Sequence, residues 1–205
     1  MKYEETGERP AGRARVIAIA GSLRQGSYNR MLLRAASVAA PSEIEVEIFP
    51  GLAAVAVFDE DLERDTNGGP QPVMALRAAV RSADGLLIST PEYNQSTSGV
   101  LKNAIDWLSR PGPDEVLVGK PTAIMGASGG RWGTRLAQAN LRQILTAAES
   151  LVMPQPAIFV AESAKVFDDA GAPRNELLQK QLQKFMVAFG DWMRVLGRRS
   201  LLKAE

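Results

Sequence analysis

The chain has 205 residues, with 24 lysines and arginines against 23 aspartates and glutamates, and it contains neither cysteine nor histidine. A formal net charge of +1 gives no broad basic field, so we expect neither nucleic acid nor an anionic membrane as a partner. The missing residue types exclude a thiolate nucleophile, a Ser-His-Asp triad, a disulfide and the usual zinc site, so the chemistry must use other side chains, the backbone or a cofactor.

The length favours one domain with a sizeable core rather than two. The first residues, MKYEETGERPAGRAR, are too charged for a signal peptide, and no window approaches the apolar length of a membrane-spanning helix. We therefore expect a cytoplasmic protein with a flexible tail at residues 1–13 and a single domain at 14–197.

Short apolar segments alternate with helical patterns along the chain. The expected strands are 14–20, 44–49, 85–90, 121–127 and 156–161, and the expected helices are about 28–40, 72–83, 99–110, 132–151 and 174–196. Four of these strands are apolar almost throughout, which is typical of parallel strands covered on both faces, whereas IEVEIF alternates and suits an edge. The pattern predicts an α/β fold, a doubly wound five-stranded parallel sheet with helices on both faces.

The last expected helix carries an amphipathic stripe that we expect to face the core, formed by Leu178, Leu182, Phe185, Phe189, Trp192 and Leu196. In a doubly wound sheet, ligands bind beyond the carboxyl ends of the strands. The loops after the first, third and fourth strands are therefore the places to look for a site.

The first of these loops, GSLRQGSYNR at 21–30, leads from a buried strand into a helix. It lacks both the lysine of a nucleotide-hydrolysing P-loop and the middle glycine of the dinucleotide fingerprint. One interpretation is a monophosphate site in which backbone N–H groups, Ser22, Ser27 and Asn29 bind the ligand and Arg24 adds a charge-assisted hydrogen bond. The other is an ordinary polar loop in which Ser27 or Asn29 caps the helix.

The other two loops could complete the site. In STPEYNQSTSG, extended backbone with Tyr93 and Asn94 could line the edge of a flat heteroaromatic ring, or Tyr93 could be a packing aromatic. In GASGGRWGTR at 126–135, the glycines would let the backbone approach a ligand closely, or would serve turn geometry alone. Three such loops at three strand ends point to one shared site.

Together, the segments GSLRQGSYNR, PEYNQSTSGVLKNAIDWLSR and GASGGRWGTRLAQANLRQIL resemble the signature loops of the NADPH-dependent FMN reductase family. These are flavodoxin-like enzymes that include the bacterial chromate and quinone reductases, and the resemblance runs from about Arg15 to Met153. It implies an FMN phosphate site at Ser22, Arg24, Ser27 and Asn29, contacts along the isoalloxazine ring from Pro91, Glu92, Tyr93 and Asn94, largely through the backbone, and Ser128 and Gly130 on the other side of the ring.

The resemblance also implies a reaction. NADPH or NADH would reduce FMN by hydride transfer to N5, and the reduced flavin would then reduce a quinone in a ping-pong cycle, with chromate, azo compounds and free flavins as further small-molecule acceptors. No catalytic side chain and no metal is required. Two alternatives stay open here, a flavodoxin-type electron carrier and a non-catalytic α/β interaction module.

Two positions depart from the family pattern. Ser98 stands where many relatives carry proline before the helix, which affects the stiffness of this loop, and Gln95 adds an amide beside the expected ring face. We expect both to influence substrate preference more than flavin binding.

Residues 52–63, LAAVAVFDEDLE, have no obvious strand or helix partner. The segment could pack over the protein's own core. The resemblance implies instead a homodimer or homotetramer in which Val55, Val57 and Phe58 are buried at the subunit interface and Asp59 lies near the partner's site.

Overall fold

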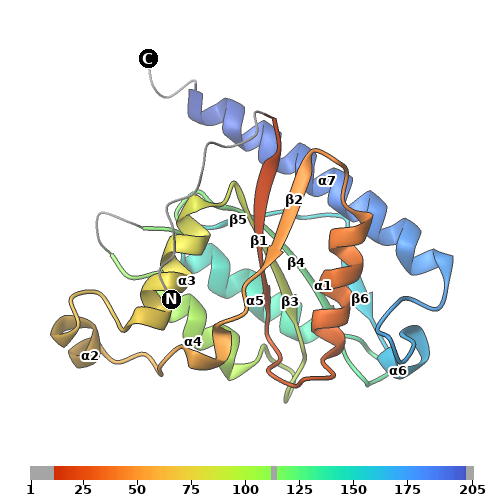
Figure 1. Ribbon diagram of the computed structural model, residues 1–205, viewed down its shortest axis with the longest axis horizontal. Coiled ribbons are helices and arrows are strands. Elements are labelled where there is room, and N and C mark those ends of the chain that lie inside the picture. The colour runs from red at the N-terminus through yellow and green to blue at the C-terminus, as the bar shows by residue number, and fades with distance from the viewer. Residues whose placement is uncertain (1–11, 112–114, 202–205) are drawn as a thin grey trace.

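A computed structural model describes residues 12–111 and 115–201, so the predicted tail lies outside the described residues up to position 11. The core is a parallel sheet with helices on both faces (Figure 1). Its strands are β1 (Ala14–Ala20), β2 (Ile44–Ile48), β3 (Gly85–Thr90), β4 (Pro121–Ala127), β5 (Leu151–Val152) and β6 (Ile158–Val160). The order β2-β1-β3-β4-β5 confirms the predicted flavodoxin-like sheet, with β6 also pairing with β4.

The fifth position of the sheet is occupied by two short strands in succession. β5 pairs with the start of β4 and β6 with its end, whereas the sequence predicts one strand at 156–161 and a helix through 151. Both expected boundaries are wrong, because the helix α5 (Arg135–Ala147) ends before Glu149, which has a left-handed φ of 56°. Between the two strands, Pro154 and Pro156 have no N–H to donate to a ladder.

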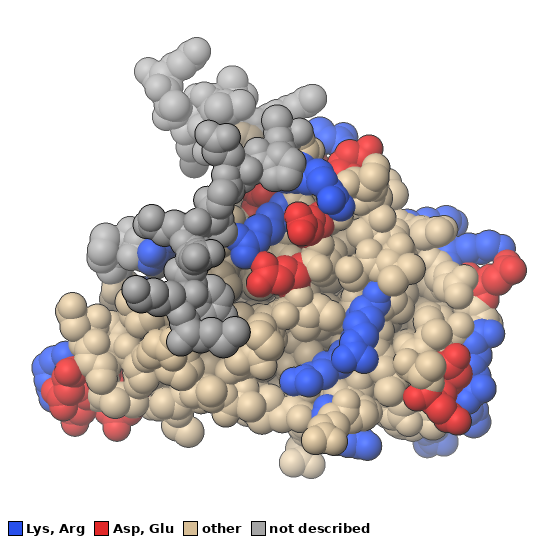
Figure 2. Space-filling view, viewed as in Figure 1, with Lys and Arg blue, Asp and Glu red and all other residues tan. Residues whose placement is uncertain are grey.

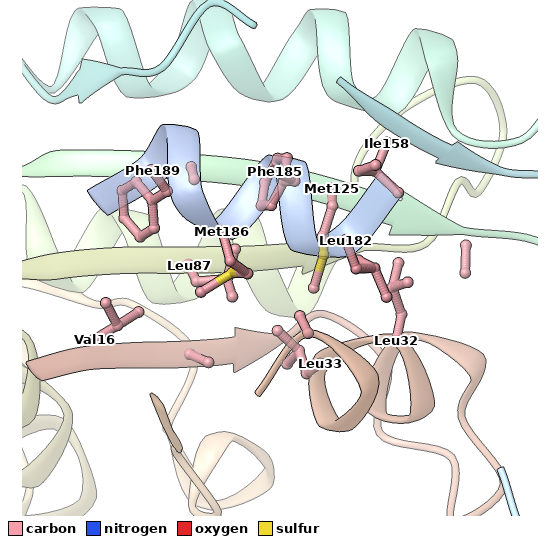
Figure 3. Close-up of a cluster of buried hydrophobic side chains, with 14 of the residues drawn as sticks. Val16, Leu32, Leu33, Leu87, Met125, Ile158, Leu182, Phe185, Met186 and Phe189 are labelled. Atoms are coloured by element: carbon pink, nitrogen blue, oxygen red, sulfur yellow. The ribbon is translucent and has the colours of Figure 1, made fainter. Parts of the chain in front are cut away.

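One face of the sheet is covered by α1 (Tyr28–Ala39) and the long helix α7 (Glu176–Leu201). Figure 3 shows α7 side chains lying against the strands in this cluster. Of the predicted stripe, Leu178, Leu182, Phe185 and Phe189 are buried, as expected. Trp192 lies at the margin, half-buried, and its indole N–H donates to the Leu151 carbonyl at 2.8 Å.

The other face is covered by α3 (Gln71–Ser82), α4 (Gly99–Leu108) and α5. The segment before α3 contains the 3₁₀ helix η1 (Leu52–Ala54) and the short α2 (Glu60–Asp65). The short α6 (Ser163–Val166) follows β6.

Residues 52–63 have a partner within the chain that was not obvious from the sequence, the helix α4, in agreement with the alternative in which this segment packs over its own core. Asn103 and Trp107 of α4 both donate to the Ala56 carbonyl, at 2.9 and 2.8 Å, and the Phe58 N–H donates to Asn103 Oδ1 at 2.8 Å. The Phe58 ring packs edge-on against Trp107, with centroids 4.9 Å apart. Val57, in contrast, is 82% exposed. The polar groups of α4 thus hold this segment against its own chain.

The surface carries both signs of charge. On the face drawn in Figure 2, basic and acidic side chains of the described residues are interspersed. Within 12–111 and 115–201, no helix has the length and apolar character needed to cross a bilayer.

Candidate functional site

The carboxyl ends of β1, β3 and β4 bring the three predicted loops together. Gly21, directly after β1, donates its N–H to the Ser89 carbonyl at 2.8 Å and accepts from the Ser98 hydroxyl at 2.7 Å. A Cβ at Gly21 would collide with the side chains of Leu101 and Pro91. Glycine is therefore required here because the first and second loops are in direct contact.

The first loop ends at the amino terminus of α1. Ser27 is the N-cap, and its hydroxyl accepts from the Arg30 N–H at 3.4 Å. Within the described residues the amides of Arg30 and Met31 are bonded to Ser27, so those of Tyr28 and Asn29 are left to bind an anion at this helix end. Ser22 is buried at the start of the loop, while Arg24 is exposed and forms no ion pair or hydrogen bond within the described residues. An unpaired guanidinium beside free helix amides fits a phosphate group.

Asn29 lies at the same helix end, but its side chain is engaged within the protein. Its Nδ2 donates to the Ala127 carbonyl at 2.9 Å, and its Oδ1 accepts from the Ala127 N–H at 3.0 Å and from the Ser89 hydroxyl at 2.8 Å. The buried amide thus joins α1 to the ends of β3 and β4.

The second loop contains a tight turn at Asn94 and Gln95. Tyr93 and Ser96 exchange two backbone hydrogen bonds of 3.0 Å each, and φ is 50° at Asn94 and 63° at Gln95. Two successive left-handed residues are typical of a type I′ turn, in which Gln carries more steric cost than Asn or Gly. Pro91 is buried before the turn, while Tyr93 is 50% exposed.

Glu92 connects this turn to the third loop, an interaction that the sequence analysis missed. Its Oε2 accepts the N–H groups of Leu136 and Ala137, at 2.9 Å each, and so caps α5. The N-cap residue of α5, Thr134, makes no side-chain capping bond, and the first turn of α5 contains no acidic residue. Since threonine is an ordinary N-cap residue, the only sequence signal for an outside partner was the lack of an acidic residue in this first turn.

Ser98, where the resemblance led us to expect a proline, connects the second loop to the first loop and to α4. Its hydroxyl accepts from the Leu101 N–H at 3.3 Å as the N-cap of α4, and it donates to Gly21 in the first loop. The Ser98 hydroxyl therefore caps α4 and forms a hydrogen bond between the two loops, neither of which a proline could do.

The third loop is held open by its own hydrogen bonds. The Ser128 hydroxyl donates to the Gly133 carbonyl at 2.9 Å, and the Ser128 carbonyl accepts from the Ser163 hydroxyl at 2.7 Å. Gly130 is exposed, and its carbonyl accepts from the Glu162 N–H at 3.0 Å. The backbone of Ser128 and Gly130 is therefore anchored to β6 and to the start of α6.

The site has no metal-binding character. Over the described ranges, there is no group of three or more acidic residues that could hold a metal ion.

A family model described as NADPH-dependent FMN reductase matches residues 14–165, which include all three loops. The chain belongs to this family. It is 40% identical to an NAD(P)H-dependent FMN reductase of Pseudomonas aeruginosa over 89% of this chain and 96% of the relative. It is also 45% identical to a quinone reductase of Escherichia coli K12, over 69% of this chain and 74% of the relative.

Among solved structures, this chain is similar to a flavoenzyme NAD(P)H:(acceptor) oxidoreductase from Paracoccus denitrificans. The TM-score is 0.80 at 33% identity, covering 88% of this chain and 97% of that one. The protein is thus an oxidoreductase that uses FMN with NAD(P)H as co-substrate, and the alternatives of a flavodoxin-type carrier and a non-catalytic module are not supported.

Proposed function

We propose that this protein reduces quinones with electrons from NAD(P)H, by a ping-pong cycle in which oxidised nucleotide leaves before the quinone enters the same space. The observation that carries the proposal is the convergence of the three loops on one edge of the sheet, joined through Gly21, Asn29 and Glu92. Relatives named quinone reductase and 2-hydroxy-1,4-benzoquinone reductase support the choice of acceptor. Chromate, azo compounds and free flavins are secondary candidates.

The first loop would hold the FMN phosphate. Arg24 and the hydroxyls of Ser22 and Ser27 surround the α1 amino terminus, and Asn29 would contribute its backbone N–H while its side chain positions the helix. Bound there, FMN supplies the acceptor atom for the nicotinamide hydride. No histidine or cysteine is available in the chain to act as acid or base, and none is needed.

The second and third loops would hold the flavin ring between them. Backbone groups of Pro91, Glu92, Tyr93 and Asn94 form one wall, and Ser128 and Gly130 form the other. Two hydrogen bonds close the Tyr93 turn and Glu92 ties it to α5, so contacts within the protein hold this wall in position. The exposed Tyr93 ring would offer a surface to a flat acceptor.

The test starts from the FMN-loaded protein, with NADPH oxidation followed at several fixed concentrations of 1,4-benzoquinone. Parallel double-reciprocal lines support the ping-pong cycle, while intersecting lines or no benzoquinone-dependent oxidation would contradict it. Arg24→Ala should weaken FMN binding by about 1.5–3 kcal/mol, the scale of a charged hydrogen bond. Arg34→Ala, at an exposed arginine of α1, is the matched control. An unchanged FMN dissociation constant in Arg24→Ala would remove that residue from the site.

We further propose that residues 14–197 act as one cytoplasmic domain that assembles as a homodimer or a dimer of dimers. Val57 remains available for a subunit interface, with Asp59 beside it, whereas Val55 and Phe58 are partly buried in their own chain. Light scattering at micromolar concentration tests this, because a monomer with full flavin content and activity would overturn it.

A further inference from the structure

The third loop carries two arginines that the flavin site does not use. The Arg131 guanidinium lies over the Trp132 ring, 5.0 Å from its centroid, and the Arg135 guanidinium lies over Phe159 at 5.1 Å. Both arginines are exposed, and neither forms an ion pair within the described part of the chain. Trp132 is 68% exposed, which is unusual for so large an apolar ring. We call Arg131, Trp132 and Arg135 the arginine platform.

Two acidic residues that contact this loop or the start of α5 are already engaged. Glu92 accepts the Leu136 and Ala137 amides at the α5 amino terminus, at 2.9 Å each, and Glu162 is paired with Lys165 at 2.6 Å. The helix end therefore has few N–H groups left for an anion, and the two guanidinium groups are the strong donors that remain. They follow Ser128 and Gly130 in the same loop, so the platform adjoins the wall proposed for the flavin ring.

This chemistry suits the one group that distinguishes NADPH from NADH, the 2′-phosphate on the adenosine ribose. A guanidinium binds a phosphate through two parallel N–H bonds, and stacking on an aromatic ring leaves that donor edge free while restricting the side chain. An exposed tryptophan face beside the pair offers a stacking surface for adenine.

We propose that Arg131 and Arg135 bind the 2′-phosphate of NADPH, with Trp132 contacting its adenine, so that the enzyme prefers NADPH to NADH. The inference rests on the proposed function, since it assigns the nucleotide end of the same site. It assigns the residues that distinguish NADPH from NADH and does not depend on which acceptor the enzyme reduces.

A direct binding measurement tests this inference without depending on catalytic activity. Adenosine 2′,5′-bisphosphate and 5′-AMP differ only by the 2′-phosphate, so each is titrated calorimetrically into the FMN-loaded protein. We expect the bisphosphate to bind at least about tenfold more tightly, the lower scale of a charged hydrogen bond. Arg131→Ala and Arg135→Ala should each remove most of this difference, Arg131→Lys should retain part of it, and Arg34→Ala, an exposed arginine of α1, should retain all of it.

Kinetics give the second measurement. In each alanine variant, KM for NADPH should rise about tenfold while KM for NADH and the FMN dissociation constant stay within about twofold. Equal binding of the two nucleotides by the unaltered protein, or an equal rise of both KM values, would overturn the assignment. If the protein oxidises neither nucleotide but still prefers the bisphosphate, the proposed function is refuted, while the 2′-phosphate site at the arginine platform is supported. If the protein reduces quinones but shows no preference for the 2′-phosphate, the proposed function is supported and the role of the arginine platform is refuted.

Discussion

Replacing Asn29 by alanine should destabilise the protein strongly before any ligand is considered. The side chain makes three buried hydrogen bonds of 2.8 to 3.0 Å, two with the backbone of Ala127 and one with the Ser89 hydroxyl. Ala127 is 2% exposed and Ser89 is 0% exposed, so water does not reach their groups in the native fold. Asn29→Ala therefore leaves two backbone groups and one hydroxyl without partners.

The magnitude follows from those three groups. An unsatisfied buried donor or acceptor costs about 1–3 kcal/mol, and partial rearrangement of the cavity lowers the sum to about 3–5 kcal/mol. This is a large part of the roughly 5–15 kcal/mol that stabilises a typical domain. Asn175→Ala is a graded control, because the Asn175 Oδ1 accepts one N–H, from Leu178, at 3.2 Å at the start of α7, and its loss should cost about 1 kcal/mol.

Urea unfolding of the FMN-free protein measures both variants, and FMN titration follows where Asn29→Ala remains folded. The result that would refute the reasoning is a loss below about 1 kcal/mol without FMN, combined with a large loss of FMN affinity. That outcome would mean that the Asn29 side chain faces the phosphate rather than β4.

Three further predictions concern the rest of the framework. Glu92→Ala should lower the free energy of unfolding by about 1–2 kcal/mol and weaken flavin binding. Glu92→Gln keeps an acceptor for the α5 amides, so it should retain part of the stability and part of the flavin affinity. Equal losses of stability in the two variants, measured by urea unfolding, would contradict the capping role. Gly126→Ala should lower the stability by about 1–3 kcal/mol because its Cβ would collide with the Thr90 carbonyl, whereas Gly129→Ala, where a Cβ meets open space, should change Tm little. Burial lowers the pKa of Lys120 below its ordinary value, outweighing the opposing effect of a nearby aspartate. Between that lowered pKa and about 10.4 the unfolded chain binds more protons, so the stability of the protein relative to Lys120→Met should rise from pH 8 to 10, and a flat difference in urea midpoints would contradict this.

The sheet could be predicted because its signals are local. Runs of apolar residues gave β1, β3 and β4 with the bounds that the structure has, since parallel strands covered on both faces need little else. The predicted strand at 156–161 contains β6, but β5 could not be placed, because it has only two residues and pairs with Pro121 and Thr122 of β4. A two-residue strand has no periodicity to detect.

The positions of the site loops could also be predicted, but the connections between them could not. Asn29 bonds to a residue 98 positions away and Glu92 to residues 44 and 45 positions away. A polar side chain in a loop gives the same local signal whether it binds a ligand, caps its own helix or caps another one. The sequence therefore predicted that the three loops lie at neighbouring strand ends, but it left the partners of these two side chains undetermined.

The helix α7 has a consequence for how the protein is made. Its Leu182, Phe185 and Phe189 close a sheet face formed by residues that include Val16 and Leu87, which precede them by about a hundred residues or more (Figure 3). During translation the part of this apolar surface that β1 and β3 contribute is made well before α7, so we expect the nascent chain to need chaperones. A premature stop codon before α7 would consequently give an insoluble product rather than a shorter enzyme, although every predicted flavin contact would still be encoded.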